Sequence, residues 1–165
     1  MEFNPQLCGH GGTATIGKGK PVILLRADMD ALQITELSGK EFTCTSGNMH
    51  ACGHDIHTAM LLTAARMLKE DEDHLHGTVK LMFQSAEEIF KGANDMIEHG
   101  ILDHPRPDAA MAYHMMIGKN QVGTYMYNAG GIMMNSVDEF KINIEGKETN
   151  GTHTHQRIDP RNHAV

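Results

Sequence analysis

The sequence contains no tryptophan, only eight other aromatic residues, and three cysteines, an odd number at irregular spacing. Cys8, Cys44 and Cys52 therefore do not form the even framework of a small disulfide-stabilised domain, and a reducing, cytoplasmic environment is the simpler expectation. No apolar run approaches the length of a membrane span, and the first residues lack the basic-then-apolar pattern of a signal peptide. We therefore expect a cytoplasmic protein without a membrane partner.

Positive charge is also in deficit. The 14 lysines and arginines are outnumbered by 21 acidic residues, which gives a formal net charge of -7 and a sequence pI near 5.9. This balance argues against nucleic acid as a partner, because such proteins carry basic patches that neutralise phosphates. The length of 165 residues is sufficient for one ordinary domain with a buried core.

The apolar pattern predicts alternating strands and helices. Continuous apolar runs are typical of strands buried on both faces, and apolar residues at helical spacing indicate amphipathic helices. We expect strands near 22–26, 78–84 and 109–114, and helices near 57–69 and 92–99. A strand, a helix and a strand in this order are typical of a right-handed crossover between parallel strands. The sequence therefore predicts an α/β fold, with a mainly parallel sheet flanked by helices.

The pattern changes towards the end of the chain. A short strand is expected at 121–127, a Gly130-Gly131 break follows, and 136–144 alternates in the manner of a half-buried strand. We expect a catalytic or binding domain at 1–130 and the beginning of a second, antiparallel unit at 131–165.

Residues 49–57, Met-His-Ala-Cys-Gly-His-Asp-Ile-His, carry the most unusual chemistry of the chain. A thiol and an imidazole from Cys52 and His54 can turn towards one point if the backbone between them forms a loop. Zinc accepts this pair of ligands most readily, and cobalt, nickel and manganese are alternatives. The plainer interpretation is a polar helix start with a buried free cysteine and surface histidines.

Further polar side chains follow each predicted strand of the parallel sheet. Asp28 and Asp30 come at the end of the first strand, Glu87 and Glu88 directly after the second, and His114 after the third. Ligands in open α/β sheets bind outside the carboxyl ends of the strands. Neighbouring carboxylates can divide labour there, one coordinating a metal and the other handling a proton. The repeated position of these residues after predicted strands therefore favours a metal site over independent surface residues.

Four segments together resemble a known family. They are RADMDAL at 26–32, MHACGHDIH at 49–57, FQSAEE at 83–88 and the Tyr-His pair at 113–114. In this order they are similar to the metal-dependent amidohydrolases that include hippurate hydrolase, bacterial N-acyl-amino-acid deacylases and plant auxin-conjugate hydrolases. The similarity extends from about Thr13 to Pro160.

The resemblance implies a fold and an activity. The family has a zinc-peptidase-like α/β domain, interrupted by a smaller α+β lid domain used in dimerisation. It hydrolyses the amide bond of small N-acyl amino acids with one or two divalent ions, such as zinc, manganese, nickel or cobalt. For this chain it implies a partial catalytic domain, the start of the lid, and a homodimer through the lid or self-association.

The resemblance also assigns roles to residues. Glu87 would be the general base that takes a proton from the attacking water. Asp28 and Asp30 match the signature and would orient the ligands. Four side chains would bind the metal ions: Cys52, His54, Glu88 and His114.

The chain departs from the family pattern at several points. The N-terminal helical segment and a fifth ligand, a histidine late in the catalytic domain, have no counterpart among the 165 residues. Residues 148–152 read Glu-Thr-Asn-Gly-Thr where the family has Gly-Gly-His-Gly-Ala, so Asn150 replaces a histidine that would hold the substrate carboxylate or the developing oxyanion. Ser85 replaces a proline. We expect a truncated chain with impaired activity.

Two alternatives remain open at this point. The chain could be a non-catalytic metal-binding or interaction protein derived from that family. Cys52 could instead be a catalytic nucleophile with His54 or His57 as its base. The second alternative gives no role to Glu87, Glu88 and His114.

Overall fold

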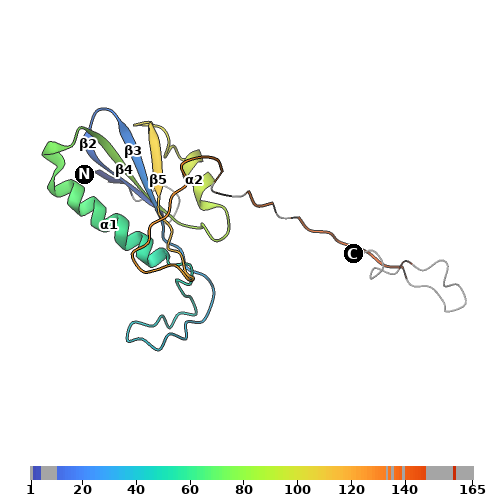
Figure 1. Ribbon diagram of the computed structural model, residues 1–165. Coiled ribbons are helices and arrows are strands. Elements are labelled where there is room, and N and C mark those ends of the chain that lie inside the picture. The colour runs from blue at the N-terminus through green and yellow to red at the C-terminus, as the bar shows by residue number, and fades with distance from the viewer. Residues whose placement is uncertain are drawn as a thin grey trace, which may run out of the picture. The chain divides into compact units, whose positions relative to one another are not determined.

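The computed structural model describes residues 2–4, 11–132, 134, 136–138, 140–147 and 158. The chain divides into two units, Met1–Lys119 and Asn120–Val165, which we describe separately (Figure 1). The first unit contains the named helices and strands. The domain boundary expected between 130 and 131 stays a prediction.

The first unit is built on a five-stranded sheet with the order β1-β2-β4-β3-β5. Its strands are β1 (Glu2–Asn4), β2 (Gly12–Lys18), β3 (Val22–Asp28), β4 (Gly77–Gln84) and β5 (Ala109–Ala112). β3 lies parallel to both β4 and β5. β2 pairs with β4 and β1 with β2 in the antiparallel direction.

The α/β fold is confirmed, and all three predicted strands of the parallel sheet are present at β3, β4 and β5. The sheet as a whole is mixed, because β1 and β2, which the sequence analysis did not predict, add two antiparallel pairings. The buried side chains of β2 are small or few, with Ala14 and Ile16 the main apolar ones. A glycine-rich strand of this kind gives a weak period-two signal, and its pairing with β4 decides its structure.

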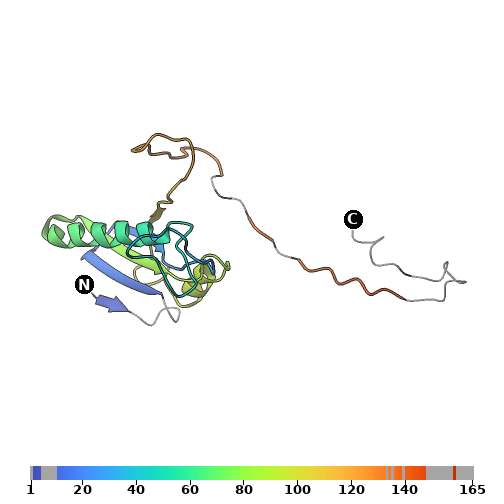
Figure 2. The same cartoon turned by 90° about the horizontal axis from the view of Figure 1, so that it is seen from below.

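Two helices cover opposite faces of the sheet (Figures 1 and 2). α1 (His54–Glu70) packs Leu61 and Ala65 into a core that contains Leu81 of β4. α2 (Gly92–Glu98) packs Met96 into a second core that contains Met82 of β4. Successive side chains of a strand point to opposite faces of the sheet. Leu81 and Met82 therefore lie on opposite faces, and so do the two helices that pack against them. A short 3₁₀ helix, Glu72–His74, links α1 to β4.

The expected strands at 121–127 and 136–144 are not formed in the described residues of the second unit. Val122 and Phe140 are fully or largely exposed, and an isolated bridge joins Lys147 to Ile158. Alternating apolar residues form a strand only when a neighbouring strand accepts and donates the backbone hydrogen bonds. The prediction of strands was therefore wrong for the described residues of these two segments.

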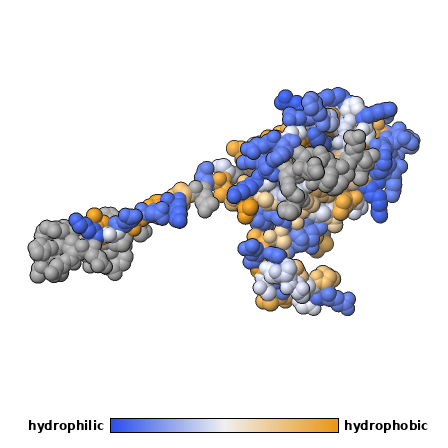
Figure 3. Space-filling model, turned by 180° about the vertical axis from the view of Figure 1, so that it is seen from behind, coloured by the Kyte–Doolittle hydropathy of each residue, from blue (hydrophilic) through white to orange (hydrophobic). Residues whose placement is uncertain are grey.

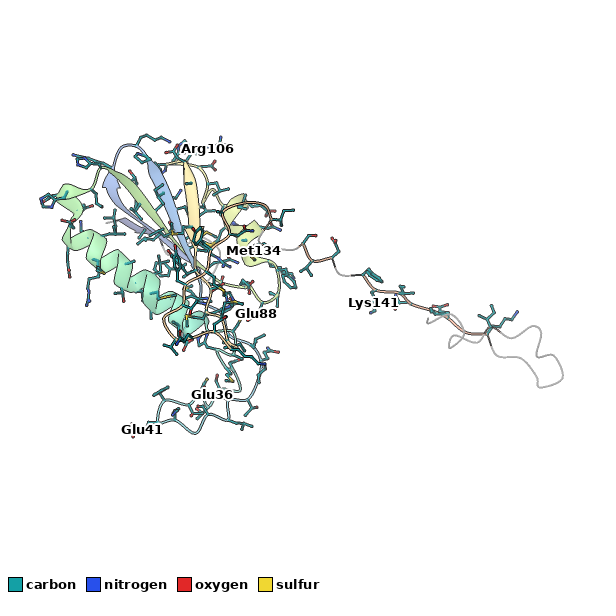
Figure 4. All side chains as sticks on the ribbon, viewed as in Figure 1. Glu36, Glu41, Glu88, Arg106, Met134 and Lys141 are labelled. Carbon is teal, nitrogen blue, oxygen red and sulfur yellow. The ribbon has the colours of Figure 1, made fainter. Side chains whose placement is uncertain are left out.

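The carboxyl ends of β3, β4 and β5 lie at one end of the sheet, where α1 begins. Figure 4 shows Glu88 near this end and Arg106, which precedes β5, at the opposite end. The loop at 33–48 extends from the same end and exposes Leu37 and Phe42. On the face of the molecule drawn in Figure 3, the surface is mainly hydrophilic, with scattered apolar residues. None of the helices in the described part of the chain has the length and apolar character needed to cross a bilayer.

Candidate metal centre

Three segments bring potential metal ligands together at the carboxyl end of the parallel strands. Cys52 and His54 come from the start of α1, Glu87 and Glu88 from the loop after β4, and His114 from the segment after β5. The Cys52 Sγ lies 3.5 Å from His114 Nε2. The His54 Nε2 lies 3.8 Å from Glu87 Oε2 and 3.8 Å from Glu88 Oε1.

His54 is the shared member of this arrangement. Among the described residues, three groups have ligand atoms within 4.8 Å of one another, and each contains His54: Cys52, His54 and His114; His54, Glu87 and Glu88; Asp28, His54 and His57. The structure therefore brings together all five residues for which the resemblance implied metal binding or catalysis.

His54 and His114 are both held in a tautomer that leaves Nε2 able to bind a metal. The Nδ1–H of His54 donates to the backbone carbonyl of Asp30 at 3.0 Å. The Nδ1–H of His114 donates to the carbonyl of Met115 at 2.6 Å. Because a carbonyl can only accept, Nδ1 carries the proton in both rings and Nε2 keeps its lone pair, which in His114 faces Cys52 Sγ. Metal-binding histidines commonly use their second nitrogen in this way.

The Nε2 lone pair of His54 faces carboxylate oxygens of Glu87 and Glu88, and an ionised carboxylate cannot donate a hydrogen bond. His54 Nε2 and Glu88 Oε1 are buried and have no hydrogen-bond partner among the described residues. Unpaired buried polar atoms are costly, and two acceptors that face each other at 3.8 Å add repulsion. A divalent cation between them would satisfy both atoms, so these residues fit such an ion.

The charge around Cys52 argues against a free cysteine nucleophile. Burial raises the pKa of the Cys52 thiol, and the nearby carboxylates of Glu88, Glu87 and Asp28 raise it further. A thiol with a raised pKa is mainly protonated at neutral pH and is a poor nucleophile. The dipole at the start of α1, which favours a thiolate, does not overcome this surplus of negative charge. A bound cation has the opposite effect, because a coordinating thiol loses its proton.

Asp30 contacts two of the potential ligands at once. Its Oδ2 accepts the backbone N–H of Glu88 at 3.0 Å, and its carbonyl accepts from His54. Asp30 Oδ1 is buried 3.6 Å from His54 Nδ1. Asp30 thereby links the end of β3 to both the α1 start and the Glu87-Glu88 loop, as expected of an orienting residue.

Asp28 forms a separate buried network next to the centre. Its Oδ1 accepts from His57 Nδ1 at 2.6 Å, and its Oδ2 lies 2.8 Å from Arg26 Nη1. Arg26 Nε donates in turn to Gln84 Oε1 at 2.8 Å. Burial by itself raises the pKa of Asp28, but the hydrogen bond from His57 and the positive charge of Arg26 together lower it below its usual value.

This lowered pKa predicts acid sensitivity. A carboxylate with a depressed folded-state pKa adds stability above its ordinary pKa, and the gain is lost as the pH falls through the folded value. We expect the metal-free chain to lose stability steadily below about pH 4, near the ordinary aspartate pKa. The Asp28→Asn variant should show a smaller slope over this range, measured by urea unfolding at several pH values. Equal slopes for both proteins would contradict the prediction.

Sequence reasoning gave His57 only a minor place and did not foresee the contacts of Arg26 and Gln84. A helical pattern extended backwards from Leu61 would have found His57, because the buried positions of α1 include His54, His57, Leu61 and Ala65. Two histidines on the buried face of a helix need polar partners. Cys8 and Asn150, which the sequence analysis also named, lie outside the described residues.

The fold and the site define an α/β protein with a candidate metal centre at the carboxyl edge of its sheet. The family model for peptidase family M20/M25/M40 matches residues 24–160. The chain therefore belongs to the M20/M25/M40 peptidase family, which confirms the class of relatives inferred from the four motifs.

Individual relatives agree with this assignment. The chain is 44% identical over 149 residues to an N-acetyl-L-cysteine deacetylase of Bacillus subtilis, covering 85% of this chain and 33% of the relative. It is 40% identical over 142 residues to an N-acyl-L-amino acid amidohydrolase of Geobacillus stearothermophilus, covering 84% of this chain and 37% of the relative. It thus spans about a third of the length of these curated relatives.

A solved structure shares the fold. The crystal structure of the Bacillus subtilis YXEP protein, described as a dinuclear metal binding peptidase from the M20 family, has 40% sequence identity and a TM-score of 0.62. The match covers 66% of this chain and 31% of that one.

Proposed function

We propose that this chain forms part of a metal-dependent amidohydrolase that cleaves the amide bond of N-acyl amino acids. The observation that carries the proposal is the pair of buried, unpartnered acceptors, His54 Nε2 and Glu88 Oε1, facing each other beside Cys52 and His114. The substrate class is supported by the two relatives named above as a deacetylase and an N-acyl-L-amino acid amidohydrolase.

The two glutamates differ in a way that supports separate roles. Glu88 is the more buried of the two, with 21% of its side chain exposed, and one of its oxygens has no partner among the described residues. The Glu87 side chain is 33% exposed, and its Oε2 lies 3.8 Å from His54 Nε2. We assign Glu88, with Cys52, His54 and His114, to metal binding, and Glu87 to proton transfer.

Amide hydrolysis needs a stronger nucleophile than neutral water. When bound, a divalent ion lowers the pKa of water from ~15.7 to about 7 and polarises a carbonyl group. In this proposal Glu87 would take the proton of the attacking water and pass it to the departing amine. General acid–base catalysis of this kind contributes about 10²–10⁴-fold to a rate.

Replacement of Glu87 by glutamine tests the proposal. We expect the 165-residue chain to bind Co²⁺ with a thiolate-to-metal absorption band, and the Glu87→Gln variant to bind it with an affinity within about three-fold of the wild type. Hydrolysis of N-acetylmethionine and hippurate should require metal and fall about 10²–10⁴-fold in the variant. The chain spans about a third of its relatives, so we expect its own rate to be low.

Two results would contradict the proposal: no Co²⁺ binding by the wild-type chain, or metal-dependent turnover that survives in Glu87→Gln. Metal binding without any turnover by the whole protein would instead favour a non-catalytic metal-binding protein. Zinc, manganese, nickel and cobalt remain the proposed ions, and dimerisation or self-association remains a prediction to be measured by the mass of the purified protein in solution.

A further inference from the structure

We propose that His57 is a positioning residue that holds the His114 segment at the metal centre through the backbone N–H of Met115. The inference rests on the proposed metal site and goes beyond it, since it assigns a role to a histidine that the ligand set leaves out. His57 lies one helical turn after His54 on the buried side of α1, with 2% of its surface exposed.

The first observation is the contact between His57 and Met115. The backbone N–H of Met115 donates to His57 Nε2 at 2.8 Å, across 58 residues of sequence. A ring nitrogen that accepts a hydrogen bond has no proton and cannot coordinate a metal at the same time. His57 therefore fits a holding role better than a ligand role, although its ring centroid lies only 4.7 Å from that of His114.

The second observation is that the contact with Asp28 fixes the tautomer of His57. Its Nδ1 lies 2.6 Å from Asp28 Oδ1, and an ionised carboxylate can only accept, so the proton sits on Nδ1. Arg26 holds the other oxygen of Asp28 at 2.8 Å, and Gln84 holds Arg26. Side chains from β3 and β4 thus keep Nε2 free as an acceptor for the Met115 N–H.

The third observation is the close packing of Met115 on the start of α1. A Cβ added to Gly53 would lie 3.3 Å from the Met115 Cβ, and Gly53 has a φ of +85°, in the left-handed region. The His114 ring itself is exposed and bonds to the carbonyl of Met115, a contact that moves with the segment. His57 and Gly53 therefore tie the His114 segment to the helix start that carries Cys52 and His54.

A double-mutant cycle measures whether His57 acts through His114. We expect His57→Phe to weaken Co²⁺ affinity about 10-fold, within the about 10–100-fold range typical of residues that orient ligands. In a His114→Ala background the same change should cost less than about two-fold. His57→Gln should recover most of the affinity, because the amide oxygen can accept the Met115 N–H. The control is His74→Phe, at a histidine whose side chain is 82% exposed.

An equal loss in both backgrounds, or no loss with His57→Phe, would overturn the proposal. If His57→Phe does not fold, His57→Ala takes its place in the cycle, because it also removes the acceptor of the Met115 N–H. A metal-free measurement on the wild-type chain is independent of any variant: the Met115 amide should exchange with solvent at least about 10-fold more slowly than an unstructured amide. Unprotected exchange at Met115 overturns the inference, whereas absence of Co²⁺ binding with a protected Met115 overturns only the proposed function.

Discussion

Replacing His54 with alanine should abolish measurable metal binding. His54 belongs to all three ligand groups, and its buried Nε2 faces the centre without a partner among the described residues. Residues that only orient a ligand typically cost about 10–100-fold in affinity, so loss of the shared ligand should cost at least about 100-fold. Competition between the chain and a chelator for Co²⁺ measures the change.

Thermal unfolding with and without metal provides a second readout. A ligand that binds only the folded state raises its stability, so added Co²⁺ should raise the melting temperature of the wild type and leave that of His54→Ala unchanged. The matched control is His99→Ala, because His99 is half exposed and bonds to its own helix at Asp95. A His54→Ala variant that binds Co²⁺ as tightly as the control would show that the centre lies elsewhere.

Replacing Gly92 with alanine should disrupt the loop that carries Glu87 and Glu88. A Cβ at Gly92 would lie 1.6 Å from the backbone oxygen of Ser85, which cannot rotate away as a side chain could. The N–H groups of Lys91 and Gly92 both donate to the carbonyl of Ala86, which closes this loop tightly. Overpacking commonly costs about 1–3 kcal/mol, and a clash with backbone should reach or exceed the upper end of that range.

Urea unfolding and Co²⁺ titration together measure this effect. The Gly92→Ala variant should unfold at a lower urea concentration and bind Co²⁺ at least about 10-fold more weakly, because Glu88 moves with the loop. Gly130→Ala is the control, since a Cβ there meets no atom within 4 Å among those described. Unchanged stability and affinity in Gly92→Ala would mean that the loop can adjust without moving its glutamates.

The sequence by itself determined the parallel half of the sheet, its helices and the kind of chemistry at its edge. The apolar runs of β3 and β4 and the apolar stripe of α1 are local sequence patterns. They can therefore be recognised without knowing which elements pack beside them. The residue types after three strands, thiol, imidazole and carboxylate, also favour a metal site where parallel strands end together. The family model matches residues 24–160, a range that contains these segments.

Only the tertiary structure decided which strands pair, and which polar atoms are left without partners. β2 becomes a strand because β4 lies beside it, whereas the alternating residues at 136–144 have no such neighbour in the described part of their unit. The tautomers of His54 and His57 depend on Asp30 and Asp28, which lie 24 and 29 residues away in sequence. Hydrogen bonds over such separations are set by the fold, because no local period records them, and they determine which nitrogen faces the centre.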